Sequence, residues 1–188
     1  LNHDDEIDGF IVQVPLPGHI NEQRIIEAID PRKDVDGFHP VNLGKMVLNL
    51  PCFLPATPMG VITLLERYNI EVEGKNCVVL GRSHNVGMPI SILLSRKAKT
   101  GNGTVTLCHS FTKDLPSITS AADILVVAIG KLGYVTAGMV KKNAVVVDVG
   151  IHRIPSDETK SGFRVKGDVL CDEVAKKCSY ISPVPGGV

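Results

Sequence analysis

The sequence predicts an α/β fold built on a Rossmann-type doubly wound parallel sheet, and three observations lead to this prediction. Four short runs are almost entirely apolar and rich in valine, as strands buried on both faces of a sheet are. Segments of helical length separate them, which implies repeated strand–helix units with right-handed crossovers. A glycine turn follows the first run. The four runs are Cys77–Leu80, Thr104–Cys108, Ala122–Ala128 and Ala144–Val149.

Composition limits the classes of function. The 188 residues suffice for one large or two small domains. The 20 basic residues equal the 20 acidic ones, so bulk charge gives no reason to expect a nucleic-acid or membrane surface. No apolar run approaches the ~18 residues of a membrane span. The five cysteines are odd in number and lack a C-x-x-C pair, so we expect no metal site and a reducing, cytoplasmic location.

The first 57 residues are expected to be part of a second α/β domain. The run Ile7–Val14 predicts a buried strand, with Gln13 either on its wet face or at its carboxyl end, where α/β folds place ligands. Asn21 can cap a helix that runs to Ile29 and is broken by Pro31. We place the domain boundaries at 1–57, 58–180 and 181–188. Leu1 is not a natural start, and we expect a chain trimmed at both ends.

A charged, turn-rich segment follows this helix. Asp34 and Asp36 lie two residues apart and point to opposite sides if the segment is extended, which disfavours a carboxylate dyad. Asp36, beside Gly37, is either a surface acid or a ligand-facing one. Residues 43–53 are interpreted as a loop. Thr57 is then expected to cap a helix, with Pro58 at its first position and an apolar stripe up to residue 68.

The glycine turn after the first apolar run is a weak indicator of nucleotide binding. Gly81 and Gly87 match two glycines of the dinucleotide fingerprint, but Ser83 stands where the second would be. A side chain there either holds the backbone away from a pyrophosphate or contacts the ligand itself. Taken alone, a simple connection is about as good an interpretation. A helix is expected from Val86 to Leu94, and shorter elements at 164–169 (strand) and 174–178 (helix).

The region after the second run favours NADP over NAD. NAD sites carry an acid there that holds the ribose hydroxyls, whereas this chain has none before Asp114. Arg82 and Ser110 would instead suit a 2′-phosphate, although Asp114 could fold back. The histidines are interpreted as ordinary surface residues, not catalysts: His84, His109 and His152.

Eight phrases occur in an order that resembles the bifunctional methylenetetrahydrofolate dehydrogenase/cyclohydrolase family, and they span essentially the whole chain. They are VQVPLP at 12–17, KDVDGF at 33–38, PATP at 55–58, GRSHNVG at 81–87, CHS at 108–110, DVGI at 148–151, GDV at 167–169 and PVPGGV at 183–188. The number and order of these phrases make a chance resemblance very improbable.

The resemblance implies two α/β lobes with a folate cleft between them, NADP-dependent oxidation of 5,10-methylenetetrahydrofolate, and hydrolysis of the methenyl product to 10-formyltetrahydrofolate. It implies a homodimer working in one-carbon metabolism and purine biosynthesis. Gln13 would adjust the catalytic lysine and Asp36 would bind the pterin. The cofactor residues would be Gly81, Arg82, Ser83, Ser110 and Ile151. The folate side would be shaped by Pro185, Gly186, Gly187 and Val188.

One departure and two alternatives remain. The family's catalytic Tyr-x-x-x-Lys pair precedes the Gln13 strand and is not found in this sequence, so for a molecule that starts at Leu1 we expect cofactor binding without cyclohydrolase activity. A different NAD(P) oxidoreductase, of the shikimate or amino-acid type, would explain the sheet but not Gln13 or Asp36. A non-catalytic NADP-binding domain would bind the cofactor without turnover.

Overall fold

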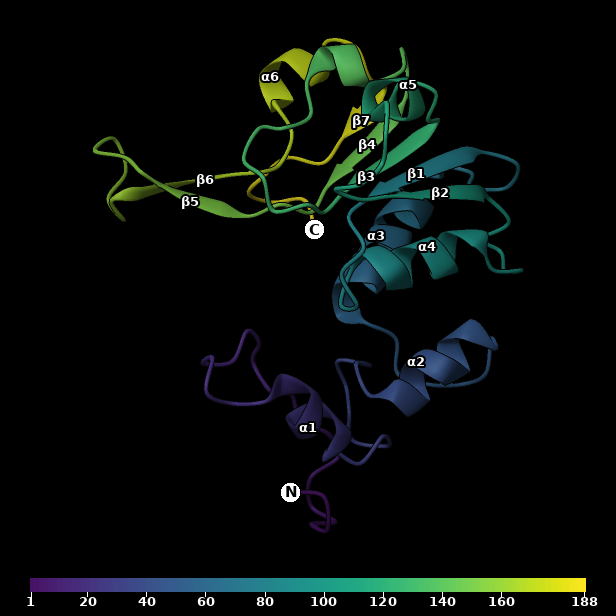
Figure 1. Cartoon of the computed structure of the whole chain (residues 1–188), viewed down its shortest axis with the longest axis vertical. Coiled ribbons are helices and arrows are strands. Elements are labelled where there is room, and N and C mark those ends of the chain that lie inside the picture. The colour runs from purple at the N-terminus through teal and green to yellow at the C-terminus, as the bar shows by residue number, and fades with distance from the viewer.

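The computed structural model describes all residues from 1 to 188. Figure 1 shows an N-terminal part with two helices below a layered sheet domain, joined through the chain that enters the third helix. These helices are α1 (Glu22–Glu27), α2 (Pro40–Val47) and α3 (Ala56–Arg67). None of the helices combines the length and the apolar character that crossing a bilayer would demand.

The centre of the structure is a five-stranded parallel sheet, which confirms the predicted fold class. Its strands lie in the order β2-β1-β3-β4-β7, and all neighbours pair in parallel. The chain moves outward from β1 to β2 and then crosses back to β3, so the winding reverses between β1 and β3. Ligands of doubly wound sheets bind at this reversal. The bounds are β1 Asn76–Leu80, β2 Thr104–Cys108, β3 Ile124–Val127, β4 Val145–Asp148 and β7 Tyr180–Ile181.

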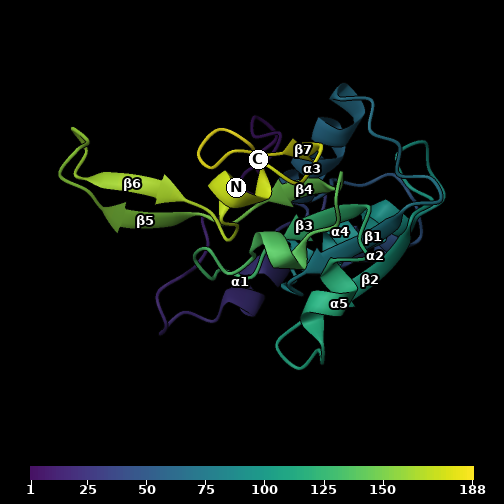
Figure 2. The same ribbon diagram turned by 90° about the horizontal axis from the view of Figure 1, so that it is seen from above.

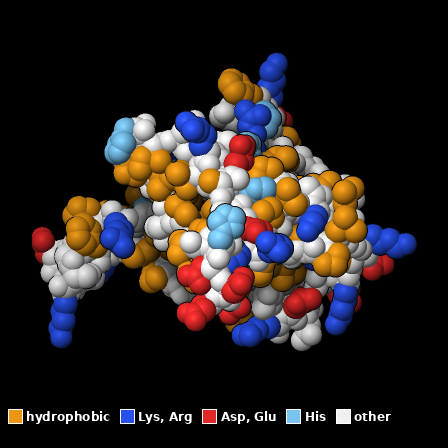
Figure 3. Space-filling view, turned by 90° about the horizontal axis from the view of Figure 1, so that it is seen from below, with side chains coloured by type: hydrophobic (Ala, Val, Ile, Leu, Met, Phe, Trp, Pro, Cys, Tyr) orange, Lys and Arg blue, Asp and Glu red, His pale blue; other side chains and the backbone are white.

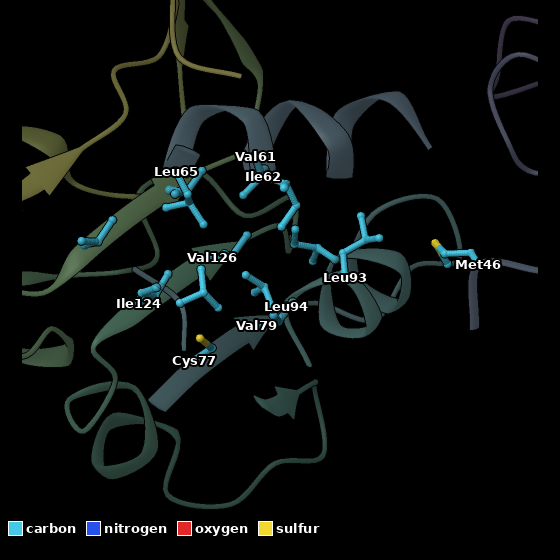
Figure 4. Packing of buried hydrophobic residues seen from close by; sticks show 14 residues of the cluster. Met46, Val61, Ile62, Leu65, Cys77, Val79, Leu93, Leu94, Ile124 and Val126 are labelled. Atoms are coloured by element: carbon cyan, nitrogen blue, oxygen red, sulfur yellow. The ribbon is translucent and has the colours of Figure 1, made fainter. Parts of the chain in front are cut away.

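The sheet is buried on both faces because successive residues of its strands point into two separate cores. Cys77 and Val79 belong to a core beneath α3 and α4 (Gly87–Ser95), whose packing Figure 4 shows. Val78 and Leu80 belong to a second core on the opposite face. This face is covered by α5 (Leu115–Thr119), the 3-10 helix η1 (Ala137–Met139) and α6 (Cys171–Val174).

The covering helices of the second face are shorter than expected. The segment between β3 and β4 forms only η1, because glycines at 130, 133 and 138 disfavour a longer helix, two of them with positive φ. The helix predicted at 174–178 lies earlier, at Cys171–Val174. The core beneath α3 and α4 therefore has the more continuous helical cover.

The buried strand predicted at 7–14 is wrong. The segment is irregular, Phe10 alone bridges to Asp34, and the Ile11 side chain is 56% exposed. No neighbouring strand extends this bridge into a ladder, and an extended segment becomes a strand only through such pairing.

Two predictions about the segment before the sheet are also wrong. Residues 43–53 were expected to be a loop, but their first part lies in α2, which begins with Pro40 and buries Met46. His39 Nδ1 accepts a hydrogen bond from the Val41 amide and caps this helix. The next helix begins at Ala56 with no side-chain cap, so Thr57 lies inside the first turn and does not cap it.

The short strand predicted at 164–169 is part of a hairpin outside the main sheet. Strands β5 (His152–Pro155) and β6 (Phe163–Lys166) pair in antiparallel register. Figure 2 shows this hairpin extending away from the sheet as a two-stranded arm. Its return leads through Gly167 back to the carboxyl ends of the sheet strands.

Gly167→Ala should lower the free energy of unfolding by about 1–3 kcal/mol, the range for forcing extra atoms into a packed interior. A Cβ at this position would overlap Oδ2 of the buried Asp148. Urea unfolding followed by circular dichroism measures the change. Gly44→Ala is the matched control, because it adds the same methyl group inside α2 where no atom lies within 4 Å. Equal stability of the two variants would contradict the prediction.

Candidate functional site

A pocket of about 370 Å³ lies where the winding of the sheet reverses. The loops that leave the carboxyl ends of β1, β2 and β3 form its walls. Its lining residues are Leu80, Gly81, Arg82, Ser83, His109, Ser110, Thr112, Leu115, Ala128, Ile129, Lys131 and Tyr134. The structure therefore brings four of the predicted cofactor residues to one place: Gly81, Arg82, Ser83 and Ser110.

Glycine is required at the start of this site because two backbone segments approach each other closely. Gly81 has a φ of +120°, and a Cβ there would overlap the carbonyl oxygen of Ala128 at the end of β3. A Cβ at Gly87 would overlap the carbonyl oxygen of Gly81 in the same way. The two glycines thus allow the turn to fold tightly between β1 and α4.

Ser83 fills the space at the N-terminus of α4. Its Oγ accepts hydrogen bonds from the amides of Val86 at 3.2 Å and Gly87 at 3.3 Å. These two donors are therefore satisfied within the chain and do not face a ligand. The hydroxyl of Ser83 keeps its own proton, which it can donate to an acceptor in the pocket.

The pocket is lined by cations and hydroxyl groups and by no carboxylate. Arg82 stands exposed on one wall, and Lys131 on another lies 5.3 Å from the centre of the Tyr134 ring. Asp114 is not among the lining residues, so the structure does not show the folding back that the sequence left open. A site of this charge suits a ligand with more than one anionic group.

His109 was set aside as a surface residue, yet it lines the pocket. Its Nδ1 accepts a hydrogen bond from the Phe111 amide at 3.2 Å, and its own amide donates to Thr112 Oγ1 at 2.9 Å. The neutral ring therefore carries its proton on Nε2. The position of His109, directly after the second strand, is the signal in the sequence from which its place at this site could have been inferred.

The other predicted site residues lie elsewhere. Ile151 follows β4 and is 68% exposed, outside the pocket. Gly186 and Gly187 line a separate, mostly apolar groove of about 200 Å³ between α3 and β7. Val188 Cγ1 lies beside Gly60 of α3, and Pro185 is exposed in the same terminal segment. The pocket that holds Arg82 contains neither Gln13 nor Asp36.

The two acids of the N-terminal part have different environments. Asp34 is buried, and its Oδ2 accepts hydrogen bonds from the His39 amide and from Asn42 Nδ2. Asp36 is only partly buried, and burial, with a smaller effect of Asp34, raises the pKa of its carboxyl group. Asp34 therefore serves the fold, and a ligand-facing role for Asp36 stays a prediction. Gln13 is exposed and donates to the carbonyl of Val14.

Two buried carboxylates, Asp148 and Asp168, bind backbone amides near the carboxyl ends of the strands, and the sequence predicted no role for them. Asp148, at the end of β4, accepts hydrogen bonds from the amides of Gly150, Asp168 and Val169. Asp168 accepts hydrogen bonds from the amides of Ile129 and Gly130. The phrases DVG and GDV contain these two acids, but only Asp148 follows an apolar run; Asp168 follows Arg164, Lys166 and Gly167, so the sequence carried a signal for Asp148 alone.

The cysteines are poorly suited to nucleophilic catalysis. All five are free thiols. Burial raises the pKa of each one, and it raises that of Cys77 to about 11, with a smaller contribution from Asp123. Because the thiolate is the reactive form, none of these side chains is activated. No group of three or more His, Cys, Asp or Glu side chains is arranged to hold a metal ion.

Comparison with known families identifies the chain. Residues 55–188 match the model of the tetrahydrofolate dehydrogenase/cyclohydrolase NAD(P)-binding domain. The chain belongs to the tetrahydrofolate dehydrogenase/cyclohydrolase family. Residues 1–36 match the model of the catalytic domain of the same family. The resemblance inferred from the ordered phrases is thereby confirmed.

The relatives in this family are longer than the chain. The bifunctional protein FolD of Cytophaga hutchinsonii is 65% identical over all 188 residues, and that of Phocaeicola vulgatus is 58% identical. The chain spans 65% of the first relative and 64% of the second.

Solved structures of the family share the fold. The FolD enzyme of Campylobacter jejuni superimposes with a TM-score of 0.90 at 48% identity, over 99% of this chain and 63% of that one. The dehydrogenase-cyclohydrolase of Trypanosoma brucei, solved with NADP and an inhibitor, also gives a TM-score of 0.90, at 37% identity and the same coverage.

Proposed function

We propose that the chain takes part in the NADP-dependent oxidation of 5,10-methylenetetrahydrofolate to the methenyl form, and in the hydrolysis of that product to 10-formyltetrahydrofolate. The observation that carries this proposal is the carboxylate-free pocket at the reversal of the sheet, in a chain of this family. The NADP bound to the Trypanosoma brucei relative supports the choice of cofactor.

The residues of the pocket suit NADP better than NAD. Arg82 is a fixed cation that can pair with a 2′-phosphate, and Ser110 offers a hydroxyl donor from the neighbouring loop. A carboxylate that would hold free ribose hydroxyls and repel a phosphate is missing from the lining. Ser83 would donate to the pyrophosphate through its remaining proton. Bound NADP supplies the hydride acceptor, while the protein holds the reacting carbons close and aligned.

The folate is assigned to the N-terminal part and the terminal segment. The carboxylate of Asp36 can accept hydrogen bonds from two adjacent donors of a pterin. Asp36 is chosen over its neighbour Asp34 because the carboxylate of Asp34 already accepts hydrogen bonds from His39 and Asn42. Gln13 would adjust the proton-transferring lysine that the family resemblance implies. Pro185, Gly186, Gly187 and Val188 would shape the folate side of the cleft, and Ile151 would contact the cofactor from the end of β4.

The proposal extends to the domain division and the assembly. We retain boundaries at 1–57, 58–180 and 181–188.

A homodimer through the cofactor domain is supported by the projecting hairpin, where Phe163 is 49% exposed. Figure 3 shows hydrophobic atoms on this arm, and charges of both signs mixed over the rest of that face, which gives no single-sign surface for nucleic acid or membrane. Five free thiols support a cytoplasmic location, and purine biosynthesis would use the product.

Incubating the protein with 5,10-methylenetetrahydrofolate and NADP tests the reaction. We expect a folate-dependent absorbance of the methenyl product, and no oxidation of shikimate or amino acids. NADP binding without any methenyl product would favour the non-catalytic alternative. Product formation with an unrelated alcohol or amine substrate would favour a different oxidoreductase.

Arg82→Ala should weaken NADP far more than NAD, because it removes a cation from the 2′-phosphate. A loss of about 1.5–3 kcal/mol in NADP binding is typical for a hydrogen bond to a charged group. Ser110→Ala should act in the same direction but more weakly. Titration calorimetry with both cofactors measures the difference. Equal losses for NADP and NAD would contradict the assignment. Lys113→Ala is the control, because it removes a cation from the loop that carries Ser110 but lies outside the pocket lining.

Asp36→Ala should weaken folate binding and leave NADP titration unchanged, because Asp36 does not line the cofactor pocket. Asp34→Ala is the informative comparison. It removes the acceptor for His39 and Asn42 and should lower the melting temperature, whereas Asp36→Ala should not. A loss of NADP affinity or of thermal stability in Asp36→Ala would assign this acid to the fold instead.

A further inference from the structure

The carboxylate of Asp168 supports one wall of the cofactor pocket from behind. Its Oδ2 accepts hydrogen bonds from the amides of Ile129 at 2.8 Å and Gly130 at 2.9 Å. Ile129, Lys131 and Tyr134 of the same loop line the pocket. Asp168 itself is fully buried and is not part of the lining. It can therefore affect a ligand only through the position of this loop.

The second oxygen of the same carboxylate is held by a histidine. His152 Nε2, on the first strand of the hairpin, lies 2.7 Å from Asp168 Oδ1. The imidazole is 22% exposed and the carboxylate is not exposed at all. With one oxygen bound to His152 and the other to the loop, the carboxylate group has one defined orientation.

The backbone beneath Asp168 is fixed as well. The amide of Asp168 donates to Asp148 Oδ1 at 3.0 Å, and a Cβ at Gly150 would overlap the Asp168 side chain. The carboxylate is thus confined by its own backbone and by the chain that leaves β4. A displacement of Asp168 would have to move the loop, the hairpin or both.

We infer that Asp168 and His152 form a positioning pair that sets the pocket wall at Ile129–Tyr134 and thereby the affinity for the dinucleotide. The inference rests on the proposed function, since it names residues that act on the NADP site without contacting NADP. The hairpin thereby gains a role in cofactor binding in addition to any part in assembly.

Replacement of Asp168 by asparagine makes the pair depend on pH. The amide oxygen can still accept from the loop, but the NH₂ group then faces His152 Nε2, which accepts only while the ring is neutral and protonated on Nδ1. A charged ring donates from both nitrogens, so its Nε2–H would repel the NH₂ group of the asparagine. In the wild type, both the neutral and the charged ring donate to the carboxylate. Two other charged groups belong to the same neighbourhood: Lys166 is the register partner of His152 on β6, and Asp148 accepts a hydrogen bond from the Asp168 amide.

The experiment measures NADP dissociation constants at about pH 8 and about pH 5.5, which bracket the usual range of histidine titration. The quantity compared is the ratio of the variant to the wild type at each pH. We expect Asp168→Asn to weaken NADP a few-fold at the higher pH and more than tenfold at the lower. The double variant with His152→Gln, whose amide can pair with asparagine at any pH, should lose this dependence.

A second pair of variants leaves Asp168 intact and serves if Asp168→Asn does not fold. His152→Leu removes the donor and should weaken NADP a few-fold, and His152→Gln should restore most of the affinity. A role confined to folding would change stability without this rescue. Wild-type affinity in both Asp168→Asn and His152→Leu would overturn the inference. It would also be overturned if the dissociation constant of Asp168→Asn, divided by that of the wild type, were the same at both pH values and equal to that of the double variant.

Amide hydrogen exchange without any cofactor separates this inference from the proposed function. Asp168→Ala, which removes the acceptor altogether, should speed exchange at Ile129 and Gly130 by at least tenfold relative to the wild type, with little change at Ala128, whose amide donates to the carbonyl oxygen of Leu80. If the wild type failed to bind NADP while this exchange pattern appeared, the function would be wrong and the positioning pair would stand. Unchanged exchange at both amides would overturn the pair.

Discussion

The arrangement of the carboxyl ends of the sheet depends on two buried carboxylates, Asp148 and Asp168. Between them they accept five backbone amide hydrogen bonds and one from a histidine, which would otherwise be unpaired donors in the interior. Ser182, which exchanges hydrogen bonds with the Asp148 backbone, adds the end of β7 to the same cluster. The exits of β3, β4, β6 and β7 are therefore fixed relative to one another.

The cluster organises the fold more than it stabilises it. Burial raises the pKa of Asp148, with a small contribution from Asp168, although its three amide donors act in the opposite direction. A raised pKa means that the contribution of this acid to stability is largest at low pH and declines as the pH rises through the folded-state value. An acid kept here despite that penalty is explained by geometry, because two oxygens can hold several amides that no apolar side chain could pair.

The polar lining of the pocket depends on two residue choices, a serine in the glycine turn and a serine after the second strand. Ser83 consumes two amides that a glycine would leave open to a pyrophosphate, and the second strand is followed by Ser110 in place of an acid. The polar groups left to face the pocket are therefore side chains, chiefly Arg82 and Lys131, rather than these two backbone amides. Side chains of this kind distinguish phosphorylated from unphosphorylated ribose, which backbone amides alone do not.

The sequence by itself determined the parallel sheet, the glycine turn and the grouping of residues 81–83 and 110 at one pocket, because each depends on local pattern: valine-rich runs, tight turns and the residue type that ends a strand. Only the tertiary structure decided what depends on distant partners. Asp168 is 39 residues from Ile129 and 16 from His152, so no local pattern could assign its role. The segment 7–14 has a strand-like composition but finds only one bridge partner, and pairing across space, not composition, makes a strand.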